Sequence, residues 1–171
     1  VIFDTVTYNT ENYPGLNSIW IEANPLTSGL QDQLEQYYFN NLARLSFEAS
    51  EDNINPILDV TFDGIHILNG DLVSSKPGIV ISLDDENEFL LLNEDADTSN
   101  FRITLKDPNG QLTQLHFTDG LGNENMRWIP ANGSDNVFSI EYDGEFLVDG
   151  TYELNIEAKD ISGNKSGDID Y

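Results

Sequence analysis

The stretch that most constrains the fold lies near the C-terminal end of the chain. Tyr152, Leu154, Ile156 and Ala158 occupy every second position, and polar residues stand between them. Successive side chains of a β-strand point to opposite faces of a sheet, so this alternation predicts a strand with one buried face. Asp160-Ile-Ser-Gly-Asn164 follows and predicts a tight loop. The chain must therefore form a sheet that packs against a core.

Similar runs recur along the chain and predict an all-β fold. They end at turn signals such as Asp107-Pro-Asn-Gly110. No helix is clearly encoded, and Phe89-Leu-Leu-Leu92 is too short to be assigned to a strand or a helix. The predicted strands are 2–8, 16–23, 42–49, 57–67, 76–83, 101–106, 112–117, 127–129, 138–142 and 152–158. The many short strands after residue 56 favour an immunoglobulin-like Greek-key β-sandwich.

The short polar segment 51–56, which ends in proline, predicts a linker between two domains. Residues 1–50 then form one unit and residues 57–171 a second. Residues 166–171 stop where the last strand of the second unit should begin. The sequence therefore predicts that this strand is truncated or is supplied by another chain.

The composition excludes several classes of function. Thirty-one acidic residues and seven basic residues give a net charge of −24, which argues against binding to nucleic acid or to an anionic membrane surface. The absence of cysteine excludes disulfides, zinc-thiolate sites and a cysteine nucleophile. The sequence contains no run of about 18 apolar residues, which a membrane-spanning helix would need. His66 and His116 occupy strand positions, where an outward histidine is expected, so the sequence predicts no enzymatic activity.

Two stretches resemble known β-sandwich modules. The sequence from Asp149 to Asn164 resembles the penultimate-strand signature of bacterial immunoglobulin-like modules, which is close to G-T-Y-x-L-x-V-x-A-x-D-x-x-G-N. The polar loop 24–41 resembles the end of the CARDB-like adhesion module, with matches at Asn24, Glu35, Asn40 and Asn41. This second resemblance implies that residues 1–50 are the C-terminal part of a CARDB-like β-sandwich.

A third resemblance covers most of the chain. Residues 55–71 and 75–87 are similar to the region that precedes the sorting domain in large surface proteins exported by the type IX secretion system of Bacteroidota, including C25 gingipain-like peptidases and sortase relatives. It implies an extracellular or cell-surface location. The expected partners are neighbouring domains of the same polypeptide, type IX secretion components or another surface protein. The function implied is that of a non-catalytic spacer, and the alternatives are an adhesion module or an accessory domain of a C25-type peptidase.

Acidic loops indicate a calcium site. Calcium takes six to eight oxygen ligands, which loops rich in Asp and Asn can supply. In an immunoglobulin-like sandwich, the loops after residue 83 and after residue 159 would lie at the same pole, close to residues 51–53. We therefore predict calcium ligands at Asp84, Asp85, Glu86 and Asp160. The alternative is that these carboxylates are simply solvated.

Two tryptophans are candidates for contact with a glycan or a protein partner. Sugar-binding sandwiches use exposed aromatic rings, so Trp20 and Trp128 are predicted to face a ligand if the chain is an adhesion module. The alternative is that the two rings cover sheet edges or the junction of the two domains.

Overall fold

The computed structural model describes residues 10, 13–27, 30–31, 34, 37, 39–88, 90–132, 135–166 and 169–170. The chain divides into two compact units, Val1–Glu51 and Asp52–Tyr171. The predicted strand 2–8 lies outside the described residues. The segment predicted to be a linker falls almost wholly in the second unit, and Pro56 within it is buried.

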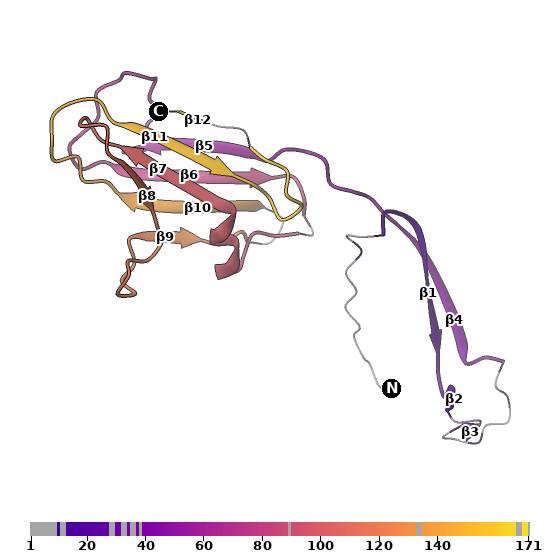
Figure 1. The fold of residues 1–171 in the computed structure, drawn as a ribbon. Helices are drawn as coiled ribbons and strands as arrows, with labels where there is room; N and C mark the ends of the chain where they lie inside the picture. Colours follow the sequence, from indigo (N-terminus) through magenta and orange to yellow (C-terminus); the bar gives the residue numbers. More distant parts are fainter. Residues whose placement is uncertain are drawn as a thin grey trace. The chain divides into compact units, whose positions relative to one another are not determined.

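In unit 1, strands β1 (Gly15–Glu22) and β4 (Leu42–Ala49) pair along their full length as an antiparallel ribbon (Figure 1). The short strands β2 (Leu26–Thr27) and β3 (Leu30–Gln31) pair with each other. Ile21 and Leu45 share one face of the ribbon and are 59% and 61% exposed. A two-stranded ribbon is marginally stable by itself, and these apolar side chains have no covering layer within the described part of unit 1.

Unit 2 contains two four-stranded antiparallel sheets, which confirms the all-β prediction (Figure 1). The first has the order β5 (Ile57–Phe62), β6 (Gly78–Asp85), β10 (Asn136–Asp143) and β9 (Met126–Ile129). The second has the order β12 (Ile169–Asp170), β11 (Glu153–Ala158), β7 (Phe101–Lys106) and β8 (Leu112–Leu115). A 3₁₀ helix, η1 (Asp95–Asn100), leads into β7 and was not predicted.

The core of unit 2 follows the predicted alternation. Every second residue of the central strands is buried, and their side chains meet between the two sheets. The ring of Phe138 lies at the centre, stacked on Phe101 at a centroid distance of 5.2 Å and on Trp128 at 5.5 Å. The most deeply buried aliphatic residues are Val60, Ile79, Ile81, Leu83, Leu92, Ile103, Ile140 and Ile156.

Three connections of unit 2 use the same five-residue loop, Asp-x-x-Gly followed by Asn or Gln. The loops are Asp107–Gln111, Asp119–Asn123 and Asp160–Asn164. In each, the glycine N–H donates to the aspartate carbonyl, the last N–H donates to the aspartate Oδ1, and the glycine has a positive φ between 83° and 92°. Such a turn followed by a left-handed glycine reverses a chain within a hairpin.

β5 differs most from its predicted length, and β8 and β10 differ by a few residues. β5 stops at Phe62, not at residue 67, because Asp63 and Gly64 adopt positive φ values of 51° and 76° and turn the chain. The carboxylate of Asp63 then accepts a hydrogen bond from the Gly78 N–H at 2.8 Å, which fixes the start of β6. Within the described residues, β12 pairs Ile169 and Asp170 with β11.

Candidate functional site

Four carboxylates gather at the end of unit 2 where β5 begins and where β6 and β11 end. We call Asp52, Asp85, Glu86 and Asp160 the acidic pole. Single carboxylate oxygens of Asp52, Asp85 and Glu86 lie within 4.8 Å of one another. Two oxygens that bind one calcium ion at 2.3–2.6 Å can be at most about 5 Å apart, so these three residues fit a shared calcium ion. The other ligands would be carbonyl oxygens and water.

Asp52 is fixed by loops that come from far along the chain. Its Oδ2 accepts hydrogen bonds from Asn87 Nδ2 at 3.0 Å and from the Ser162 hydroxyl at 3.1 Å. Asn164 Nδ2 donates to the Asp52 carbonyl at 3.1 Å, and Ile54 N–H donates to Oδ1 at 3.1 Å. Together the hydrogen bonds outweigh partial desolvation and lower the pKa of Asp52. The first residue of unit 2 is therefore part of its fold and not a free linker.

Asp85 is a buried carboxylate with one strong hydrogen-bond donor. It is 3% exposed, and its Oδ2 accepts from Asn136 Nδ2 at 3.0 Å. Asn136, itself 2% exposed, also lies within hydrogen-bond distance of the carbonyls of Asn87 and Leu90, and its Oδ1 accepts the Leu92 N–H at 2.9 Å. Asn136 thus joins strand β10 to the loop that follows β6.

Burial raises the pKa of Asp85 to about 6, and the charges of Asp160, Asp52 and Glu86 add to this effect. Both causes disfavour the ionised form. At neutral pH the folded protein must nevertheless hold this carboxylate ionised next to three others. A divalent cation would remove that penalty, because it would neutralise the repulsion and replace lost hydration.

The four predicted calcium ligands do not all lie in equivalent positions. Asp85 and Glu86 lie together, and Asp52 completes the group. Asp84 is exposed and precedes Asp85 in β6, so it lies on the opposite face of the strand. Asp160 is 1% exposed and adds its charge to the acidic pole, but both of its oxygens already accept hydrogen bonds from Asn164 within the turn, each at 2.8 Å.

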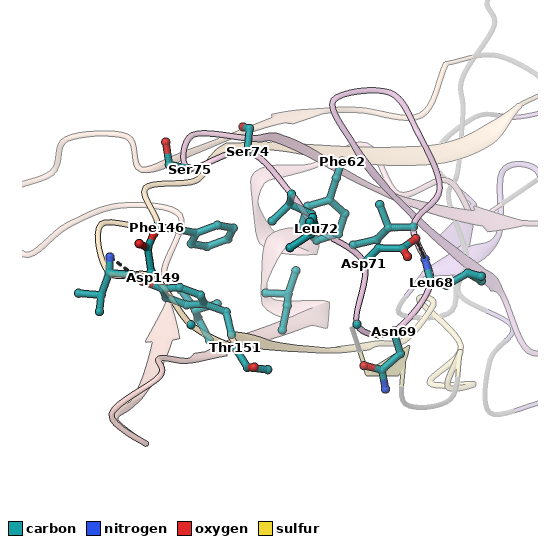
Figure 2. Close-up of a pocket in the computed structure, with 18 residues that line it drawn as sticks. Phe62, Leu68, Asn69, Asp71, Leu72, Ser74, Ser75, Phe146, Asp149 and Thr151 are labelled. Carbon is teal, nitrogen blue, oxygen red and sulfur yellow. Dashed lines mark hydrogen bonds between the residues drawn. The ribbon is translucent and has the colours of Figure 1, made fainter.

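A pocket of about 450 Å³ lies at the opposite end of unit 2, where β5 ends and β11 begins. Figure 2 shows the two segments that line it, 67–75 and 146–154. Its floor includes Phe62 and the ring of Phe146, which stacks on Tyr152 at 4.6 Å. Leu72 at its rim is 100% exposed. The pocket combines an apolar floor with two carboxylates, those of Asp71 and Asp149.

The candidate ligand-facing tryptophans lie in different environments. Trp20 in β1 is 59% exposed, and the guanidinium of Arg44 lies 5.2 Å from its ring centroid. Trp128 in β9 is half-buried and stacks almost parallel on Phe138, with an interplanar angle of 9°. The Trp128 ring therefore contributes to the core of unit 2, which leaves Trp20 as the exposed tryptophan.

The two histidines are exposed and lie outside the acidic pole. His66 Nε2 is 2.8 Å from Asp59 Oδ1, and 69% of the His66 side chain is accessible to solvent. His116 is also exposed and directly follows β8. Surface ion pairs of this kind contribute little to stability.

Comparisons with known proteins identify no relative: no family model, no curated protein and no solved structure matches the chain. Among the described residues, none of the helical segments is long and apolar enough to cross a membrane.

Proposed function

We propose that the chain is a non-catalytic structural segment of a secreted cell-surface protein, in which unit 2 is an immunoglobulin-like spacer module. The strand order supports this proposal. Lettered A to G in chain order, with β8 as an additional strand C′, the sheets of unit 2 read A-B-E-D and G-F-C-C′. Immunoglobulin-type sandwiches have A-B-E-D in one sheet and strands C, F and G in the other.

The hydroxyl of Tyr152 also supports the immunoglobulin-like assignment. It donates to the Val148 carbonyl at 3.0 Å and accepts the Val148 N–H at 3.2 Å. Tyr152 directly precedes β11, the strand lettered F. A tyrosine near the start of strand F that bonds to the backbone a few residues upstream is a hallmark of immunoglobulin-like domains.

The single observation that carries the spacer function is the attachment of Asp52. A spacer transmits position and force through the ends of its module, and Asp52 is joined by side-chain hydrogen bonds to the loops after β6 and β11. We further propose that calcium binds at the acidic pole and stiffens this attachment. Asp52, Asp85 and Glu86 would hold the ion, which would supply only charge neutralisation and crosslinking.

The test is thermal unfolding of the full 171-residue chain in excess calcium and in chelator. A site occupied at 100 times its dissociation constant adds about 2.7 kcal/mol to the free energy of unfolding. We expect the melting temperature of unit 2 to rise with calcium, and we expect Asp52→Asn to abolish the rise. Asp84→Asn is the matched control. It also removes one negative charge, but from a carboxylate that lies on the face of β6 opposite to Asp85. Identical curves in calcium and chelator would refute the calcium proposal.

The spacer role has its own readout in hydrogen exchange. In Asp52→Ala, the Ile54 amide loses its side-chain acceptor and the segment before β5 loses charge-assisted hydrogen bonds. We expect faster exchange of that amide, with unchanged exchange in β6 and β10. If the Ile54 amide exchanges at the same rate in both proteins, Asp52 does not hold the start of the module.

The second candidate function is adhesion, and the pocket at the opposite end of unit 2 favours it. An apolar floor with exposed leucines at the rim is the kind of surface that binds a partner. From the resemblance to type IX secretion proteins we make two further proposals. The first is export to the cell surface, and the second is a role as an accessory domain of a C25-type peptidase. Mass spectrometry of the full-length protein recovered from the cell surface would decide which domains adjoin this segment.

A further inference from the structure

Two lysines oppose each other at the end of β11. Lys159 and Lys165 form an isolated antiparallel bridge. The hydrogen bonds lie on either side of this pair, from Asp160 N–H to the Asn164 carbonyl and from Ser166 N–H to the Ala158 carbonyl. In such a non-hydrogen-bonded pair the two side chains start from the closest spacing that a sheet allows. Two like charges are therefore held opposite each other, which is destabilising.

This pairing is unusual for a chain with 31 acidic and only seven basic residues. Four of the other cations each lie near a carboxylate, in the pairs Lys76–Glu145, Arg102–Glu157, Lys106–Glu153 and Arg127–Glu141. Arg44 lies over the ring of Trp20. Within the described part of the chain, Lys159 and Lys165 have no carboxylate within ion-pair distance. Among the described residues, the two lysines that face each other therefore have neither a carboxylate nor an aromatic ring as a partner.

The lysines line a pocket of about 190 Å³ at one end of the outer face of the second sheet. Arg102 of β7 lies beside them and is opposite Glu157, at a long ion-pair distance of 3.8 Å. Lys159 N–H donates to the Asn100 carbonyl at 3.2 Å, which holds the end of η1 against β11. Three cations and one carboxylate therefore line this pocket, together with Ser99 and Asn100 as polar neighbours. The local charge is positive on a strongly negative protein.

We propose that this pocket binds an oxyanion, a carboxylate or sulfate group, between Lys159, Lys165 and Arg102. The anion would relieve the repulsion of the lysine pair, and Arg102 can bind an oxyanion through two N–H groups. The volume is below that of pockets for drug-sized ligands, so the ligand is a free oxyanion or one acidic sugar residue. This proposal goes beyond the spacer function and does not depend on calcium binding.

The first experiment measures the melting temperature of the full chain at low ionic strength, where screening is weak. The probes are sodium sulfate against sodium chloride at equal ionic strength, and glucuronate against glucose. At ten times the dissociation constant we expect a rise of about 3 °C with the anionic probe over its control. A response to sulfate alone would identify a free oxyanion, and a response to glucuronate as well would extend the site to acidic sugars.

The decisive variant is Lys159→Gln combined with Lys165→Gln. Without anion we expect it to melt above the wild type, because the repulsion is gone, and we expect the response to both anions to disappear. Lys106→Gln is the matched control: it removes a lysine of β7 that is paired with Glu153, and should leave the anion response unchanged. An equal rise in the double variant and the wild type would overturn the proposal, because it would be a general salt effect.

A final variant addresses Asp168, the first carboxylate that follows Lys165 in the sequence. Asp168 lies outside the described residues, and Asp168→Asn tests whether it neutralises the lysines. If the oxyanion site exists, this variant binds the anion at least as tightly as the wild type does. A wild type that ignores every anion, together with a variant that responds, would show that Asp168 occupies the site and would refute the proposal.

Discussion

The substitution Asp85→Asn should stabilise the calcium-free protein at neutral pH. Asp85 is a buried carboxylate whose pKa rises from 3.8 to about 6, first through desolvation and then through the charges of its neighbours. Since one pKa unit corresponds to 1.36 kcal/mol, ionising Asp85 at pH 7.5 costs the folded state about 3 kcal/mol. The substitution removes the charge but keeps a carbonyl oxygen that can accept from Asn136. It should therefore recover much of that free energy, a rise of roughly 10 °C in melting temperature.

The sign of the pH dependence makes this prediction specific. The folded-state pKa of Asp85 is higher than the unfolded-state value, so the folded protein binds more protons between pH 3.8 and 6. The Asp85 contribution is most favourable below pH 3.8 and is lost as the pH rises through about 6. The stabilising effect of Asp85→Asn should thus be absent near pH 4, grow with pH and level off above pH 7. Calcium should raise the melting temperature of the wild type but not that of Asp85→Asn. The difference in stability between the two proteins should therefore become smaller.

The assay is urea unfolding in chelator at several pH values between 4 and 7.5, with unfolding monitored by circular dichroism. Asp84→Asn serves as the control, since it removes an exposed carboxylate one position away and should change the free energy of unfolding by less than about 0.5 kcal/mol. A wild type as stable as Asp85→Asn at pH 7.5 would refute the reasoning. A difference that does not vary with pH would show that packing, not ionisation, causes the effect.

Two further substitutions test the packing of unit 2. Asn136→Ala should destabilise the protein by about 2–4 kcal/mol in chemical denaturation, because it strips a buried carboxylate and buried backbone groups of their partner; a loss below 1 kcal/mol would contradict this role. Gly150→Ala should destabilise it strongly, because φ is +151° and the added Cβ would lie 2.6 Å from Cβ of Pro108; Gly110→Ala, which meets no atom within 4 Å, controls for backbone strain alone.

The strands could be predicted because their alternation is local. The bounds of β4 and β7 agree with the predicted ranges 42–49 and 101–106. The same alternation contained a signal that distinguishes Asp84 from Asp85: with Ile81 and Leu83 inward, position 85 must also face inward. The predicted calcium site nevertheless contains both carboxylates, because it rests on their adjacency in the sequence and not on this alternation.

The role of Asn136 could not be predicted in the same way. It depends on the register of β10 against β6, which sets Asn136 opposite Asp85 although 51 residues separate them. The stacking of Trp128 on Phe138 likewise depends on which edge of the sheet β9 joins. Local patterns carry no information on such long-range registers. The prediction that the loops after residues 83 and 159 lie close to residues 51–53 agrees with the hydrogen bonds of Asn87 and Ser162 to Asp52, but the individual partners of Asp52 depend on the same long-range registers.

The recurrent five-residue loop divides the folding of unit 2 into fast and slow steps. Each loop closes a hairpin between neighbouring segments, and hairpins form within microseconds. β6 and β10, by contrast, pair across more than 50 residues, as do their counterparts β7 and β11 across more than 45. Closing these long loops costs entropy before any contact is gained, which slows folding. We therefore expect the hairpins to form first. The pairing of β6 with β10 and of β7 with β11 should follow more slowly and limit the folding rate.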